Sequence, residues 1–76
     1  MPDKSKWVVM SQTILKAELK RRNIGYRELA ERLTAMGTPE TDRNIANKIS
    51  RGGFTAAFFI EFLVAIGVQT LRLEAE

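Results

Sequence analysis

Apolar residues recur with helical spacing in several stretches of this chain, and glycines lie between the stretches. A first helix is expected over residues 6–22, which contain no Gly or Pro and place Leu15 and Leu19 on one side. A second helix is expected over 26–36, where Leu29 begins an i, i+1, i+4, i+7 pattern of apolar residues. The pattern therefore predicts two helices in the first half of the chain.

A third helix has two possible starts. Thr38–Glu40 combines a capping hydroxyl, a proline and an acid, and Thr41–Asp42 offers a second start three residues later. The helix is expected to end near Arg51, before two glycines, and to bury Ile45 and Ile49, which lie four residues apart. The end of this helix is therefore predicted, and its start stays open between the two signals.

A fourth helix is expected over residues 55–66, and Glu61 is its only charged residue. A helix that is apolar all round is buried on all sides, which is hard to arrange in so small a domain. It is either the central core helix or a helix with one face, including Phe59 or Leu63, on a second copy of the chain, and we expect a homodimer. Residues 68–73 are compatible with a fifth short helix or a strand; the alternation of two leucines slightly favours the strand.

Length and composition narrow the classes of function. A chain of 76 residues forms one domain with one small core, and we expect a flexible basic arm over 1–5 and a single helical domain over 6–76. His and Cys are both absent, which removes the commonest general base and the commonest metal ligands. We therefore expect no enzyme, no catalytic residue, no metal and no cofactor. No apolar run approaches the roughly 18 residues that span a bilayer and no signal peptide is evident, so we expect a cytoplasmic protein that does not bind membranes.

The charge of the chain is unevenly distributed. Residues 1–53 contain 11 Lys and Arg against 6 Asp and Glu, whereas residues 54–76 contain 1 against 3. A basic surface favours nucleic acid or an acidic partner. Four cations near the end of the first helix suit the helix dipole there, and we do not assign them a phosphate: Lys16, Lys20, Arg21 and Arg22.

The third helix carries the most informative polar residues. Four of them lie at i, i+3, i+4 and i+7 and share one side of the helix: Asn44, Asn47, Lys48 and Arg51. Asn binds adenine and Arg binds guanine through two hydrogen bonds, and Lys binds phosphate. This side has the chemistry of a helix that enters the major groove of DNA, although surface helices in general also have a polar side.

Three segments of the chain resemble, in the same order, the Cro/C1-type (lambda-repressor-like) helix-turn-helix family. Ile24–Leu33 resembles the second helix of that family, in which a Leu-Ala pair and a later Leu pack on the recognition helix. Ile45–Gly52 resembles the recognition helix with its terminal Gly, and Phe62–Val68 resembles the fourth helix with its hydrophobic-Gly-hydrophobic end. The resemblance covers about residues 14–73 and implies an all-α, compact domain of four to five helices.

The connection between helices two and three departs from the family pattern. Leu33 and Ile49 lie 16 positions apart, about six more than a tight helix-turn-helix connection requires. The extra residues fall within 34–42 and lengthen helix two, the connection or helix three, so we expect an extended helix 2–3 connection. The chain also resembles a group of small bacterial single-domain proteins of unassigned function, which share its Leu15–Arg22 and Lys48–Gly52 segments; that second resemblance supplies no activity.

The helix-turn-helix resemblance implies a transcriptional regulator that places helix three, about residues 41–51, in the major groove of double-stranded DNA. As a dimer it would contact two half-sites about 34 Å apart. The residues expected to contact bases are Asn44, Asn47, Lys48 and Arg51. Those expected to contact phosphates are Tyr26, Arg27, Arg43, Lys4 and Lys6. Tyr26 is equally compatible with a half-buried position beside Arg51 or Phe54. The competing expectation is a non-enzymatic protein-interaction module that keeps the helix-turn-helix shape without binding DNA.

Overall fold

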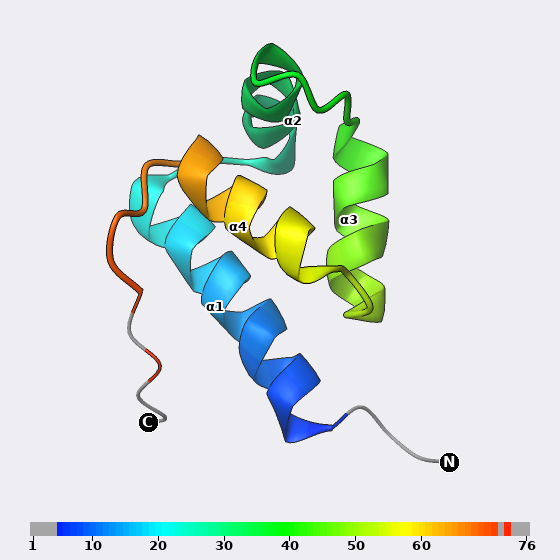
Figure 1. Cartoon of the computed structure of the whole chain (residues 1–76), viewed down its shortest axis with the longest axis vertical. Helices are drawn as coiled ribbons and strands as arrows, with labels where there is room; N and C mark the ends of the chain where they lie inside the picture. The colour runs from blue at the N-terminus through cyan, green and yellow to red at the C-terminus, as the bar shows by residue number, and fades with distance from the viewer. Residues whose placement is uncertain (1–4, 72, 74–76) are drawn as a thin grey trace.

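The computed structural model describes residues 5–71 and residue 73, and these residues form four α-helices and no strand (Figure 1). The helices are α1 (Lys6–Arg22), α2 (Tyr26–Ala35), α3 (Asp42–Arg51) and α4 (Ala56–Ala65). The all-helical prediction is confirmed. Within the described part of the chain, no helix is both long and apolar enough to cross a membrane. Lys4 and most of the expected arm lie outside the described residues.

Short polar residues begin three of the four helices. The side-chain oxygens of Ser5, Thr41 and Thr55 accept hydrogen bonds from the backbone N–H three residues ahead, at 3.2, 3.1 and 3.0 Å. Gly25 precedes α2 and supplies no side-chain cap. The N–H groups at the start of α2 are therefore open to another acceptor.

The third helix begins at the second of its two expected starts. The end of α2 uses Gly37 (φ +98°) and Thr38, whose N–H donates to the carbonyl of Leu33 at 2.9 Å. Because its backbone completes α2, Thr38 does not cap the next helix, and the first expected start is wrong. The additional residues lengthen the connection itself, which runs over 36–41.

One hydrophobic core lies where the four helices meet. α3 and α4 both pack on α2, and α4 also packs on α1. Figure 1 shows α1 and α4 side by side, with α3 at one edge and α2 across the top. The largest fully buried side chains come from all four helices: Leu15, Leu29, Leu33, Ile45, Ile49 and Phe62. Burial of one such side chain stabilises the fold by about 1.5–3 kcal/mol.

The end of α3 is held by α1. Gln12 Nε2 donates to the carbonyls of Ile49 at 2.6 Å and Ser50 at 3.1 Å, both in the last turn of α3. Gly52 follows with φ +73°, and a Cβ at this position would lie 3.0 Å from Gln12 and closer still to Val8. Both the backbone conformation and the close approach of α1 therefore require glycine at Gly52.

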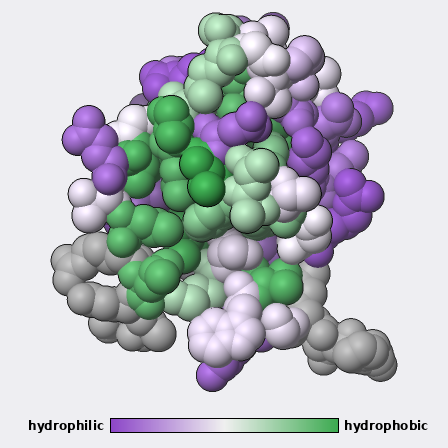
Figure 2. All heavy atoms as spheres, in the orientation of Figure 1, coloured by the Kyte–Doolittle hydropathy of each residue, from purple (hydrophilic) through white to green (hydrophobic). Residues whose placement is uncertain are grey.

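The fourth helix is buried on one side only. Phe58, Phe62 and Leu63 are in the core, whereas Ile60 and Val64 are 59% and 57% exposed. Figure 2 shows hydrophobic side chains at the surface over α4 and the segment that follows it. Of the two alternatives expected for this helix, the fully covered core helix is wrong, because Ile60 and Val64 stay exposed although α1 and α2 pack on α4. A face on a second copy of the chain stays a prediction.

The segment after α4 is neither of the two expected elements. Val68–Leu71 and Leu73 form no helix and no strand. The N–H of Val68 donates to the carbonyl of Leu63 at 2.9 Å, and Gly67 (φ +84°) makes the turn between them. Val68 and Leu71 then pack on the edge of the core. The segment is therefore held by contacts of its side chains with the core.

Candidate nucleic-acid interface

The two sides of α3 differ as the sequence predicts. Ile45 and Ile49 are fully buried, and α3 packs on α2. Successive residues turn by roughly 100° around a helix, so the residues opposite the buried pair face outward. The exposed residues on that side include two asparagines and two arginines: Arg43, Asn44, Asn47 and Arg51. The view in Figure 2 is mostly hydrophilic at the edge where α3 lies in Figure 1.

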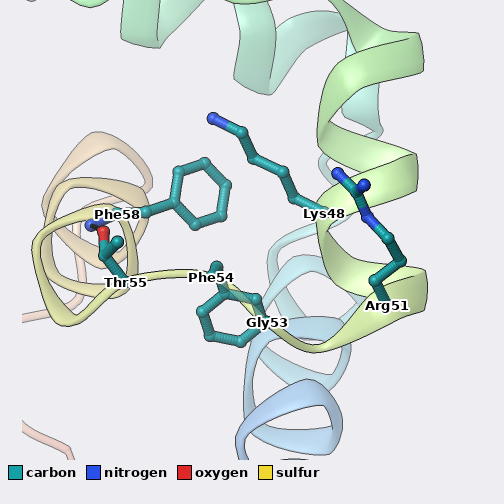
Figure 3. Close-up of a pocket in the computed structure, with 6 residues that line it drawn as sticks. All are labelled: Lys48, Arg51, Gly53, Phe54, Thr55 and Phe58. Carbon is teal, nitrogen blue, oxygen red and sulfur yellow. Dashed lines mark hydrogen bonds between the residues drawn. The ribbon is translucent and has the colours of Figure 1, made fainter.

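Lys48, one of the residues expected to contact bases, forms an ion pair with an acid of the same chain. Its Nζ forms an ion pair with Glu40 Oε2 and lies 4.6 Å from the centre of the Phe58 ring. Its side chain is 37% exposed. Figure 3 shows Lys48 extending from α3 toward Phe58 on α4, while Arg51 runs along α3. Asn44, Asn47 and Arg51 are exposed, whereas the side chain of Lys48 turns toward α4.

Glu40 is the functional candidate that sequence reasoning missed. It lies in the connection before α3, and its side chain is 5% exposed. Its backbone N–H donates to Thr34 Oγ1 at 3.3 Å, and the Thr34 hydroxyl lies 3.5 Å from the Glu40 carbonyl oxygen. An acid eight residues before a lysine has no helical signature, so only the folded connection brings the two together.

The pocket between α3 and α4 has a volume of about 430 Å³. Six residues line it (Figure 3): Lys48, Arg51, Gly53, Phe54, Thr55 and Phe58. Arg51 therefore lies near the beginning of α4, where backbone N–H groups and the helix dipole favour an anion. This end of α3 has the chemistry to hold a phosphate beside the exposed polar side.

The start of α2 carries two of the expected phosphate contacts. Tyr26 is half-buried and Arg27 is exposed, next to the N–H groups that Gly25 leaves uncapped. Tyr26 lines a depression with Lys16 and Lys20 of α1, whereas the neighbours expected as an alternative, Arg51 and Phe54, line the α3–α4 pocket. The structure therefore places near Tyr26 two cations, Lys16 and Lys20, which the sequence alone relates only to the helix dipole.

The remaining cations of α1 have partners within their own helix. Arg21 forms an ion pair with Glu18 at 3.2 Å, and Arg22 pairs with the other oxygen of the same carboxylate. Lys6 is exposed at the beginning of α1, and its Nζ lies 4.8 Å from the centre of the Trp7 ring. The start of α1 thus contributes Lys6, one of the expected phosphate contacts, to the described surface.

Two acids lie near Arg27, one of the expected phosphate contacts. Arg27 lines a hollow between α2 and the start of α3 together with Glu31 and Asp42. Both acids are exposed, and they reduce the positive potential at this end of α3. The opposite end of α3, with Arg51 and the start of α4, is therefore the more favourable position for a phosphate.

Both residues expected at a dimer interface pack against other residues of the same chain. Leu63 is only 7% exposed and belongs to the core. Phe59 is half-buried, and its ring stacks on Phe54 with centroids 6.2 Å apart. The outward apolar side chains of α4 are instead Ile60 and Val64, at i and i+4.

The fold and the exposed side of α3 define a small all-helical domain with one polar and basic helix face and one apolar helix face. A family model described as a domain of unknown function (DUF6471) matches residues 7–71, and the chain belongs to this family. No curated protein and no solved structure matches the chain. Membership of this family supplies no activity.

Proposed function

We propose that this protein is a small DNA-binding domain of the lambda-repressor-like helix-turn-helix type and that it regulates transcription by placing α3 in the major groove. The observation that carries the proposal is the exposed side of α3, with Asn44, Asn47 and Arg51 turned outward while Ile45 and Ile49 are fully buried. Amide and guanidinium groups are the side chains that bind base edges through two hydrogen bonds.

The surroundings of α3 support this orientation. The start of α4 beside Arg51 and the uncapped start of α2 beside Arg27 both offer N–H groups to phosphates. Phosphate contacts on either side of a recognition helix fix its position on the duplex. The longer connection leaves Arg43 and Asn44, in the first turn of α3, exposed, so this end of the helix stays accessible to DNA.

The proposal includes a two-fold dimer. The outward side of α4 carries Ile60 and Val64, with Ala56 and Ala57 exposed at its beginning. An apolar stripe without charge is compatible with a copy of itself across a two-fold axis. Two copies of α3 would then meet two half-sites about 34 Å apart.

The test is fluorescence anisotropy of a labelled random duplex titrated with the protein between roughly 50 and 200 mM salt. We expect binding that weakens steeply with salt, and weaker binding in Arg51→Ala, which removes the cation beside the start of α4. Arg21→Ala is the control, because it also removes one positive charge but lies on α1 and pairs with Glu18. Equal losses in Arg51→Ala and Arg21→Ala would contradict a specific role for α3.

A second candidate function is a protein-interaction module, and the exposure of Ile60 and Val64 is the observation that favours it. In this case α4 is the binding surface and α3 is an ordinary solvated helix. A correctly folded sample that shows no DNA binding at the lowest salt would favour the interaction module over the DNA-binding domain.

A further inference from the structure

The ion pair between Glu40 and Lys48 lies at the border of the proposed DNA interface. Lys48 follows Asn47 directly and lies one helical turn before Arg51. Its Nζ is nevertheless held between Glu40 Oε2 and the face of the Phe58 ring. A flexible lysine next to two proposed contacts to DNA is thus directed toward α4.

Glu40 is well placed to keep Lys48 there. Its side chain is almost fully buried, and two hydrogen-bond contacts with the Thr34 hydroxyl fix its backbone against α2. The second carboxylate oxygen, Oε1, is buried and receives no hydrogen bond from the described residues. A buried carboxylate with one unpaired oxygen depends strongly on its single cation, so the pairing with Lys48 is the main compensation for the burial of Glu40.

We propose that Glu40 is a positioning residue that withdraws Lys48 from DNA and thereby limits sequence-independent binding. The inference rests on the proposed function. An ammonium on a flexible stem contacts phosphates of any sequence, whereas the amides and guanidinium on the exposed side of α3 distinguish bases. With Lys48 withdrawn, the contacts of α3 are dominated by groups that select a sequence.

The test compares the salt dependence of DNA binding for wild type, Glu40→Gln, Glu40→Gln/Lys48→Met and Glu31→Gln. Glu31→Gln is the control, because it removes the same charge from an exposed position on the neighbouring helix. Release of Lys48 adds one phosphate contact, which makes the negative slope of log affinity against log salt steeper by about 0.9. Between 50 and 200 mM salt, the affinity of Glu40→Gln should therefore fall about 3.5-fold more than that of wild type.

We expect Glu31→Gln and the double variant to keep the wild-type slope. A Glu40→Gln slope equal to that of Glu31→Gln would overturn the inference, because no contact would have been released. A double-variant slope shallower than that of wild type by about 0.9 would also overturn it, since Lys48 would then already contact DNA in the wild-type protein.

The ion pair is tested separately, without DNA, by urea unfolding of the same proteins and Lys48→Met. Loss of Lys48 alone leaves a buried carboxylate without its cation, so Lys48→Met should unfold at lower urea than the double variant or fail to fold where the double variant folds. A Lys48→Met midpoint equal to or above that of the double variant would overturn the pair. If all proteins fold but none binds DNA, the proposed function is wrong, and the urea midpoints still report on the pair.

Discussion

Helices α3 and α4 have the same length and similar ends, yet they present opposite surfaces to solvent. Each has ten residues and a threonine cap, and a glycine with positive φ follows each of them. The outward side of α3 is polar, with Asn47 near its centre, whereas the outward side of α4 carries Ile60 and Val64. Local capping therefore explains why both segments are helices, and the outward side chains decide which kind of partner each surface can bind.

The largest expected effect separates the two sides of α4. Phe62 is fully buried and Ile60 is mostly exposed, although both are large apolar residues of the same helix. Phe62→Ala should lower the free energy of unfolding by about 3–5 kcal/mol because it leaves a cavity in the core. Ile60→Ala should change the free energy of unfolding of the monomer by less than about 0.5 kcal/mol. Urea unfolding at a protein concentration where the chain is monomeric measures both, and similar losses would show that Ile60 is buried within the monomer.

The end of α3 provides a second contrast, between adjacent glycines. Gly52→Ala should lower the free energy of unfolding by about 1–3 kcal/mol, since the residue has φ +73° and its Cβ would collide with Val8. Gly53→Ala should have little effect, because no atom lies within 4 Å of a Cβ there. Thermal unfolding compares the two variants. A Gly53→Ala loss as large as that of Gly52→Ala would contradict the packing of α1 on this turn.

A third prediction sharpens the role of the polar side of α3. Once a preferred duplex has been selected from a random pool, Asn47→Ala should weaken binding to it by about 1–3 kcal/mol. Binding to a scrambled duplex should change much less, because a base contact is lost and phosphate contacts remain. Anisotropy titrations on both duplexes measure the difference. Equal weakening on the two would place Asn47 on the DNA backbone.

The smallest expected effect concerns the apolar side of α4. Ile60→Asp should weaken self-association at least tenfold, which corresponds to about 1.4 kcal/mol, because it places a charge at the proposed two-fold contact. Ala17→Asp, at an exposed position on α1, is the control for the added charge. Sedimentation equilibrium measures both. A monomeric wild-type protein over the whole concentration range would exclude the proposed dimer.

Particular residues show why part of the structure was predictable. Thr41, Thr55 and Gly37 act on backbone groups within a few residues of themselves, so their effects are visible in the sequence. The first expected start of α3 is wrong because the backbone of Thr38 completes the end of α2. The sequence offers Thr38 both as the end of α2 and as a cap for α3 and does not decide between the two. The expectation of a central core helix for α4 is wrong because composition alone does not show which residues of a helix the rest of the chain covers.

The sequence by itself determined the four helices and the separation of α3 into an apolar and a polar side, since capping groups, glycines and apolar spacing act over one or two turns of chain. Only the tertiary structure decided that Lys48 pairs with Glu40 beside Phe58 and that Ile60 is left exposed while Leu63 is buried. These features depend on contacts across the α2–α3 connection and between helices, where segments separated in sequence meet and exclude water from some side chains and not from others.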